Sequence, residues 1–163
     1  EQLRLAAPMH DVGKIGIPAA ILTKPGALTE DERKVMNYHA RIGYEILHDE
    51  QRSPLTDLAA EIAISHHERW DGNGYPNGLK GEEIPLSGRI VALCDVYDAL
   101  RSPRPYKQAW SAERAQAHIR DNAGGHFDPH LVQIMSSMFA ELEALQLTMA
   151  DRAEPFTLSP QHD

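Results

Sequence analysis

The chain has 163 residues, which is the usual length of one domain. Hydrophobic residues make up 42% and charged residues 25% of it, a composition that excludes disordered and fibrous proteins. The net charge of −8 argues against sequence-independent binding of DNA or RNA, because such binding depends on Lys and Arg against phosphates. The longest uncharged stretches are much shorter than the roughly 20 residues that span a bilayer, and a single cysteine, Cys94, favours a reducing compartment. We therefore expect a cytoplasmic domain that contacts neither nucleic acid nor a membrane.

Helical signals dominate the sequence, and no stretch alternates apolar and polar residues long enough to predict a strand. The expected fold class is all-α. Six helices are predicted from their N-caps, apolar spacing and terminating Gly or Pro residues: 2–9, 29–48, 53–67, 87–101, 111–122 and 129–147. Residues 1–147 form one predicted domain and 148–163 a polar C-terminal tail. Because the sequence begins at Glu1 inside a helical pattern, we expect further chain upstream of it.

Turn-forming residues separate these helices at two places. Gly13, Gly16 and Pro18 open a turn-rich connector that runs to Gly26. Residues 71–78 read DGNGYPNG, which predicts a long loop without a regular element.

Histidines lie on the inward faces of two predicted helices. His39 stands in a stripe of apolar residues at helical spacing, which comprises Val35, Ile42 and Ile46. A single such histidine is more often a hydrogen-bonded core residue than a metal ligand. His66 and His67, however, end the next apolar helix, so imidazoles arrive from two neighbouring helices.

Carboxylates accompany these histidines. Asp95 lies in a helix that is apolar on nearly every face, so we expect it to be buried and near a cation. Another carboxylate, Asp11, follows His10 after the first helix. If the helices pack around one core, four imidazoles and two carboxylates converge, a donor set that suits a divalent transition metal rather than Ca²⁺ or Mg²⁺. A carboxylate that bridges two such ions suits the hydrolysis of phosphate esters.

Three segments carry a family signature: 10–15 (HDVGKI), 66–76 (HHERWDGNGYP) and 95–100 (DVYDAL). In order and spacing they resemble HD-GYP domains, and the resemblance extends from about Leu5 to Leu131. These domains are all-helical members of the HD superfamily of metal-dependent phosphohydrolases, and they hydrolyse the bacterial messenger cyclic di-GMP. The resemblance implies a hydrolase that converts cyclic di-GMP to pGpG and, with a full metal site, to GMP.

The resemblance also implies a set of metal ligands: His10, Asp11, His39, His66, His67 and Asp95. Asp11 is expected to bridge two ions, one held by the histidines at 39, 66 and 67 and the other by His10 with Asp95. Two or three divalent ions are implied, Fe or Mn first, with Zn, Ni or Co as alternatives. The family takes a further ligand from a preceding helix, so we expect the pair His10 and Asp95 to hold its ion incompletely in this sequence.

Basic residues near these ligands match family positions that contact phosphate. The resemblance implies that Lys14 and Asp11 are catalytic and that Lys14 contacts the scissile phosphate. It also implies that Arg104 and Lys107 bind substrate phosphate. From the residues alone, a solvated loop side chain is the favoured interpretation of Lys14 and the simplest one for Arg104 and Lys107, and only the resemblance favours phosphate binding. Asp98, one helical turn beyond Asp95, is expected to orient a ligand rather than bind metal.

The Gly-Tyr-Pro element itself has two open interpretations. Gly74, Tyr75 and Pro76 include no acid, base or strong metal ligand, so we assign them to the shape of the loop or to docking of a partner. Cys94 is expected in the core.

Two other functions stay open at this stage. A non-catalytic cyclic di-GMP sensor or docking module, for example for a diguanylate cyclase, is disfavoured by the complete set of six ligands. A general HD nucleotidase acting on dNTPs is disfavoured by the long Gly-Tyr-Pro loop. The resemblance further implies an upstream receiver or sensory domain, as in a two-component response regulator, and a homodimer is compatible with it.

Overall fold

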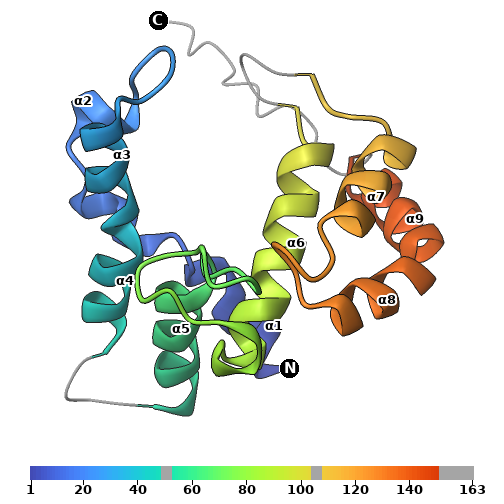
Figure 1. The fold of residues 1–163 in the computed structure, drawn as a ribbon, viewed down its shortest axis with the longest axis horizontal. Helices are drawn as coiled ribbons and strands as arrows, with labels where there is room; N and C mark the ends of the chain where they lie inside the picture. Colours follow the sequence, from blue (N-terminus) through green and yellow to red (C-terminus); the bar gives the residue numbers. More distant parts are fainter. Residues whose placement is uncertain (49–52, 104–107, 151–163) are drawn as a thin grey trace, which may run out of the picture.

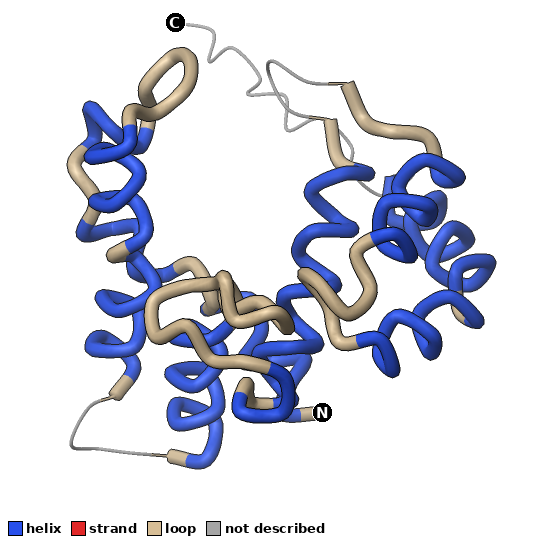
Figure 2. Tube along the Cα trace, viewed as in Figure 1, coloured by secondary structure: helices blue, strands red, loops and turns tan. Residues whose placement is uncertain are grey.

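The computed structural model describes residues 1–48, 53–103 and 108–150. This part of the chain forms nine α-helices (Figure 1): α1 (Gln2–Ala6), α2 (Ala19–Leu22), α3 (Glu30–Asn37), α4 (His39–Leu47), α5 (Pro54–Ser65), α6 (Leu86–Arg101), α7 (Ala112–Asp121), α8 (Pro129–Ser137) and α9 (Phe139–Ala150). It also forms three 3₁₀ helices: η1 (Ala7–Met9), η2 (Val12–Gly16) and η3 (Gly81–Glu83). Across the described residues there is no strand (Figure 2). An isolated β-bridge joins Ala123 and Phe127. The all-α prediction is confirmed, and none of the described helices is long and apolar enough to cross a membrane.

Side-chain caps set several helix starts where the sequence predicts them. The Thr29 hydroxyl accepts the amide N–H of Glu32 at 3.2 Å, and the Glu32 carboxylate accepts the Thr29 N–H at 2.7 Å. This reciprocal box begins α3. Ser53, Ser111 and Asp128 cap the starts of α5, α7 and α8 through their side-chain oxygens.

Two predicted helices are each divided by one residue. At Tyr38 the backbone N–H bonds to the Val35 carbonyl at 3.1 Å, a three-residue spacing that ends α3 before α4 begins at His39. Met138 separates α8 from α9 in the same way, and α9 runs on to Ala150. The division at Tyr38 changes which faces are covered: Val35 is 38% and Ile46 47% exposed, so the predicted apolar stripe holds only around His39.

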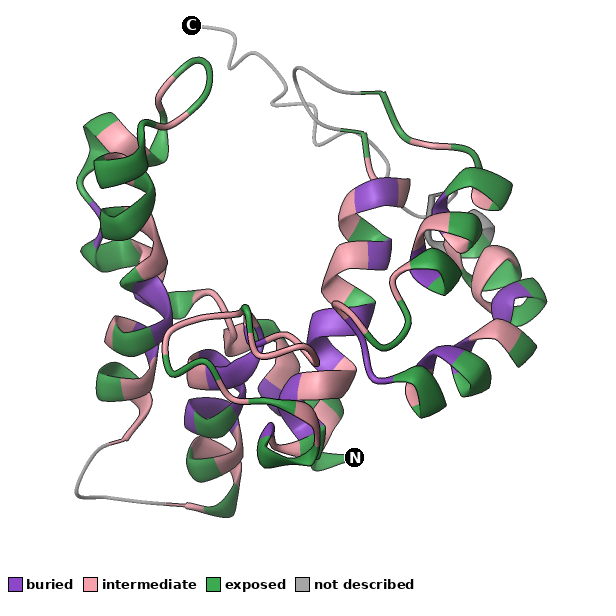
Figure 3. Ribbon diagram, in the orientation of Figure 1, coloured by how far each residue is buried: buried purple, intermediate pink, exposed green. Residues whose placement is uncertain are grey.

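Helix α6 contributes to two hydrophobic cores. Its Val91 joins the first core, built with Ala6 of α1 and with Ala59 and Ile62 of α5. The second core combines residues of α6 with residues of α7, α8, α9 and the turn between α7 and α8, namely Leu93, Tyr97, Leu100, Ala115, Ile119, Phe127, Val132, Met135 and Phe139. In Figure 3 the buried positions follow α4, α5 and α6, whereas α2 and α3 have no buried residue.

A charged network fixes α9 against α6. The Arg101 guanidinium donates to the Glu143 carboxylate at 2.6 Å and to the Trp110 carbonyl at 2.6 Å. The Tyr97 hydroxyl donates to the same carboxylate at 2.5 Å, and burial together with this contact raises the pKa of Tyr97 to about 12. These bonds satisfy the polar groups that the second core would otherwise leave without partners.

One face of α6 is more open than the sequence predicts. Cys94 is exposed, and the Asp95 side chain is 36% exposed, so the prediction that both are buried is wrong. Both residues line a groove of about 480 Å³ against α1 and η1, where Leu3 and Ala7 form the opposite wall.

The turn between α7 and α8 carries a histidine that favours its neutral form. Burial lowers the pKa of His126 to about 4, and its ring stacks on Phe127 with centroids 4.2 Å apart. In the unfolded chain the histidine has a pKa of ~6.5. Between pH 6.5 and pH 4 the unfolded chain therefore binds more protons than the folded chain. The stability contributed by neutral His126 is therefore complete above pH 6.5 and is lost as the pH falls toward 4.

We expect His126→Gln to flatten this pH dependence. In urea unfolding at pH 7.5 and pH 5, the wild type should lose of order 1 kcal/mol more than the variant, after allowance for solvent screening. If the free energy of unfolding fell by the same amount in both proteins, His126 would be shown to bind a proton in the folded state without destabilising it.

Candidate metal centre

The predicted donor residues come from different helices, and all of them except Asp95, which lies within α6, stand at or near the end of a helix. His10 follows η1, Asp11 precedes η2, and His39 is the first residue of α4. His66 and His67 directly follow α5. One donor atom from each of Asp11, His39, His66 and His67 lies within 4.8 Å of all the others. Helix ends that point at a common centre thus bring together residues that are far apart in the sequence.

A contact between two backbones sets the position of Asp11. A Cβ atom on Gly13 would lie 2.0 Å from the His39 carbonyl oxygen and 2.3 Å from the amide nitrogen of Gly43. Only glycine allows this approach of η2 to α4. The approach places Asp11, two residues before Gly13, beside the imidazole of His39.

The Asp11 carboxylate faces two groups of donors. Its Oδ1 lies 3.3 Å from His39 Nε2 and 3.9 Å from His66 Nε2. Its Oδ2 lies 3.4 Å from His10 Nε2 and 2.5 Å from Lys14 Nζ. His10 Nε2 is in turn 3.6 Å from Asp95 Oδ1. One carboxylate therefore connects an inner group of donors to an outer group at His10 and Asp95.

Backbone carbonyls select the tautomer of three histidines. The Nδ1 of His10 lies 2.8 Å from the Ala7 carbonyl, and that of His39 lies 2.8 Å from the Met36 carbonyl. His66 Nδ1 contacts the carbonyls of α5 at 3.0 and 3.1 Å. Because a carbonyl can only accept, each Nδ1 carries a proton, and at His39 and His66 the Nε2 keeps its lone pair toward the centre. This is the arrangement that metal-binding histidines use.

Unsatisfied polar atoms support the fit of a metal ion. Asp11 Oδ1, His39 Nε2 and His66 Nε2 are buried, and none has a hydrogen-bond partner among the described residues. A buried polar atom without a partner costs about 1–3 kcal/mol, so three at one point call for a shared partner. Since all three are acceptors aimed at one another, a cation satisfies them together. The donor set of imidazole nitrogens and a carboxylate fits a divalent transition metal.

The protonation of the inner histidines agrees with this role. Burial lowers the pKa of His66 to about 4 and that of His67 to about 3, so both are neutral at pH 7 and can donate a lone pair. In Asp11, burial acts to raise the pKa, but hydrogen bonds with His10 and Lys14 outweigh it and hold the pKa below its usual range. The carboxylate is thus ionised in the centre.

The outer donors behave differently. Hydrogen bonds to Asp11 and Asp95 raise the pKa of His10 to about 10, and the same contact with His10 lowers the pKa of Asp95. A proton on His10 therefore links the two carboxylates. The inner donors are set up as acceptors, whereas His10 must release its Nε2 proton before that atom can bind a metal ion.

A cleft gives access to the donors. It has a volume of about 310 Å³ and is lined on one side by Asp11, Lys14 and His67 and on the other by residues of α6: Asp95, Val96, Ala99 and Leu100. Lys14 thus lies in the cleft next to Asp11. Asp98 is not brought to the donors: it is exposed, its hydrogen bond among described residues goes to Ser102 Oγ at 3.4 Å, and it lines the groove against α1. Arg104 and Lys107 lie outside the described residues.

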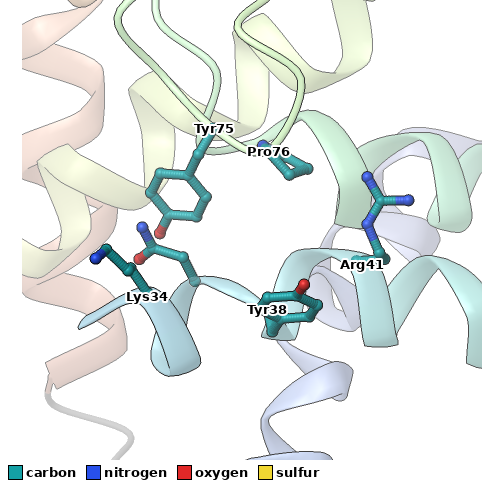
Figure 4. A pocket seen from close by; sticks show the side chains of 6 residues that line it. Lys34, Tyr38, Arg41, Tyr75 and Pro76 are labelled. Carbon is teal, nitrogen blue, oxygen red and sulfur yellow. The ribbon is translucent and has the colours of Figure 1, made fainter. Parts of the chain in front are cut away.

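The Gly-Tyr-Pro loop covers the opposite side of the donors. The Tyr75 ring stacks on His67 with centroids 4.8 Å apart and planes 27° apart. Beyond Tyr75 lies a separate pocket of about 260 Å³, lined by Pro76 of the loop and by residues of α3, α4 and the joint between them (Figure 4): Lys34, Asn37, Tyr38 and Arg41. Tyr75 therefore forms a wall between this pocket and the donors.

Sequence reasoning missed the residue that closes this loop. Glu68 is 2% exposed, and its carboxylate accepts the backbone N–H of Asn77 at 2.7 Å and that of Leu79 at 3.1 Å. The available signal was an acidic residue directly before a loop whose backbone amides need acceptors. Only the folded loop shows which amides those are.

Comparison with known proteins places the chain in a family. The HD domain model matches residues 1–131. The cyclic di-GMP phosphodiesterase response regulator RpfG of Xanthomonas campestris pv. campestris is 52% identical over 143 residues, covering 88% of this chain and 38% of that protein. The 3′3′-cGAMP-specific phosphodiesterase 2 of Vibrio cholerae is 44% identical over 151 residues, covering 93% of this chain and 29% of that protein.

A solved structure has a similar fold. The crystal structure of the cyclic GMP-AMP specific phosphodiesterase V-cGAP3 of V. cholerae matches with a TM-score of 0.61 at 22% identity, over 84% of this chain and 37% of that chain. This chain spans about a third of the length of the curated relatives it matches. With a family model matching from Glu1 to Leu131 and relatives at these identities, the chain belongs to the HD domain family.

Proposed function

We propose that this chain is the catalytic domain of a cyclic dinucleotide phosphodiesterase, which cuts the 3′–5′ phosphodiester of cyclic di-GMP to pGpG and onward to GMP. The observation that carries the proposal is the cluster of unsatisfied acceptors around Asp11, open to a cleft that Lys14 lines. The names of the relatives, which are phosphodiesterases of cyclic di-GMP and of 3′3′-cGAMP, support the substrate class.

In this proposal the metal ions divide between the two groups of donors. Asp11 Oδ1 with His39, His66 and His67 would hold one ion, and Asp11 Oδ2 with His10 and Asp95 the other. The outer group has fewer donors and a half-exposed carboxylate, so it should hold its ion less tightly. Fe or Mn fits the mixed donors best, with Zn, Ni or Co as alternatives. Metal analysis of the purified protein shows whether two or three ions bind. When bound, such ions lower the pKa of a coordinated water and polarise phosphoryl oxygens.

The chain's own residues supply the remaining steps. The ammonium of Lys14 would neutralise charge that develops on the phosphate or donate a proton to the leaving 3′ oxygen. Asp11, ionised by its contacts with His10 and Lys14, holds the donor groups in register. Arg104 and Lys107 are proposed to bind substrate phosphate. Local positive charge of this kind lets a chain with a net charge of −8 bind a dianionic ligand.

Lys14 and Arg104 should have separable kinetic roles. We expect Lys14→Ala to lower kcat by about 100-fold or more with metal content retained, because proton transfer contributes roughly 10²–10⁴-fold. Arg104→Ala should mainly raise KM, since a phosphate contact of equal strength in ground and transition states affects binding alone. Steady-state kinetics with metal analysis of each variant measures this. If both variants had wild-type kcat and KM, Lys14 and Arg104 would be solvated loop side chains without a part in catalysis or binding.

The function itself is tested by product analysis. The protein is purified without chelator and without oxygen, its metal content is measured, and it is incubated with cyclic di-GMP, 3′3′-cGAMP or dNTPs. Metal-dependent release of a linear dinucleotide supports the proposal. Binding of cyclic di-GMP without turnover would favour the sensor or docking module, and hydrolysis of dNTPs alone would favour the nucleotidase.

The likeness to RpfG also supports a regulatory context. We propose that the chain is the output domain of a cytoplasmic bacterial signalling protein with an upstream receiver or sensory domain. A diguanylate cyclase is a proposed partner at the Gly-Tyr-Pro loop, and a homodimer is a proposed assembly.

A further inference from the structure

His67 is held differently from the other three histidines of the centre. His10, His39 and His66 each donate from Nδ1 to a backbone carbonyl. In the described part of the chain, no hydrogen bond is made by the His67 ring, although its donor atom belongs to the four-residue cluster. A histidine that binds metal normally has its ring orientation fixed by such a second contact. Something else must therefore fix the plane of His67.

For His67, ring stacking with Tyr75 replaces the carbonyl contact that orients the other three histidines. Its ring lies nearly parallel to the His67 ring, at 4.8 Å and 27°, and edge-on to His39, at 6.4 Å and 79°. The backbone holds the two residues together as well, because the Tyr75 N–H donates to the His67 carbonyl at 3.2 Å. A parallel aromatic face opposes rotation of the imidazole about its bond to Cβ, since any rotation drives the ring into its neighbour.

The loop is in turn fixed to the residue that follows His67. The Glu68 carboxylate accepts two backbone N–H groups just beyond Tyr75, at Asn77 and Leu79. On the other side of Tyr75, a Cβ on Gly74 would lie 2.4 Å from the Arg69 nitrogen and 2.5 Å from Glu68 Cα. The loop is thus pressed against residues 68 and 69 before Tyr75 and hydrogen-bonded to Glu68 after it. Tyr75 has little freedom to leave the His67 ring.

We propose that Tyr75 is a positioning residue for His67, which fixes the imidazole by ring stacking, and that the Glu68 carboxylate is the anchor that keeps Tyr75 in place. The inference deepens the proposed function and rests on it for the identity of the cluster as a metal centre. It gives the tyrosine of the Gly-Tyr-Pro element a task at the metal ligands, although the side chain itself binds no metal.

The test compares the stacking face with the hydroxyl. Tyr75→Phe keeps the face, and Tyr75→Leu removes it. Tyr44→Leu is the matched control, because Tyr44 stacks on His48 at 4.7 Å and 18°, and neither residue belongs to the donor cluster. Co²⁺ is titrated into each metal-free protein and followed by its visible spectrum. We expect Tyr75→Leu to weaken Co²⁺ binding by roughly 10–100-fold, the usual cost of losing a partner of a metal ligand. Tyr75→Phe and Tyr44→Leu should stay within about twofold of the wild type.

Glu68→Gln tests the anchor. It should weaken Co²⁺ binding in the same direction, and the double variant with Tyr75→Leu should bind no more weakly than the poorer single variant, because both act through one contact. Circular dichroism and thermal unfolding check that each variant folds. If Glu68→Gln does not fold, the three tyrosine variants decide the question alone.

The outcomes separate this inference from the proposed function. Wild-type Co²⁺ affinity in Tyr75→Leu would overturn the positioning role, whatever the activity of the protein. A wild type that binds Co²⁺ but hydrolyses no cyclic dinucleotide would overturn the phosphodiesterase proposal, while the affinities would still test Tyr75. A wild type that does not bind Co²⁺ would overturn both.

Discussion

Replacement of His66 by alanine is expected to remove the inner metal ion and to abolish hydrolysis of cyclic di-GMP. The side chain is fully buried, its Nδ1 is held by two carbonyls of α5, and its Nε2 faces Asp11 Oδ1 at 3.9 Å. Alanine offers no donor, and the surrounding backbone holds the gap open. The loss in metal affinity should exceed the roughly 10–100-fold that is usual when only a partner of a ligand is removed.

Metal content per chain and kcat/KM measure this effect. Asp95→Ala is the companion variant: it should lower occupancy of the outer group and activity, with a smaller change in stability, since its side chain is 36% exposed. His48→Ala serves as the control, because His48 is outside the donor cluster. Full metal content and turnover in His66→Ala would rule out the assignment of this residue as a ligand.

Gly13→Ala is expected to damage both the fold and the metal centre. The added Cβ would overlap backbone atoms of α4, at 2.0 Å from the His39 oxygen and 2.3 Å from the Gly43 nitrogen, so η2 must move away. Overpacking of this kind costs typically ~1–3 kcal/mol, and the rigidity of backbone puts this site at the upper end or above. The same movement carries Asp11 away from His39, so metal affinity should fall with stability.

A neighbouring glycine provides the matched control for this prediction. A Cβ on Gly16, also in η2, would meet side-chain atoms of Ile42 at 3.0–3.1 Å, and these can give way. Urea unfolding and Co²⁺ titration should therefore place Gly16→Ala close to the wild type and Gly13→Ala well below it. Equal behaviour of the two variants would show that the η2 backbone adjusts without cost.

The sequence was most informative where one residue type has one local task. Thr29 begins α3 as predicted, because a capping box depends only on residues four apart at most. The identity of the donor residues followed from short motifs as well, because segments 10–15, 66–76 and 95–100 carry the resemblance to HD-GYP domains that implies them. Their distances did not, because these depend on how close η2 approaches α4 at Gly13, and that contact joins distant parts of the chain.

The wrong predictions concern faces that only packing can assign. Asp95 and Cys94 lie in a helix of apolar composition, which predicts burial on every side, but both line a groove against α1 and η1 that leaves Cys94 exposed and Asp95 partly exposed. The sequence does not reveal that Glu68 holds the loop that carries Tyr75. Glu68 acts through backbone amides of the loop, and Tyr75 acts through a ring contact with His67. No periodicity in the sequence encodes a contact of that kind.

The membership of α6 in both hydrophobic cores has a mechanical consequence for the metal centre. The donors Asp11, His39, His66 and His67 are all carried by segments outside α6, whereas Asp95 is carried by α6 itself. Because Val91 of α6 packs on α5 in the first core, a displacement of α6 together with α7–α9 would change the 3.6 Å separation of His10 and Asp95 and would also push on the helix that ends directly before His66. Movements of the C-terminal helices would thus reach the outer pair directly and the inner group through α5.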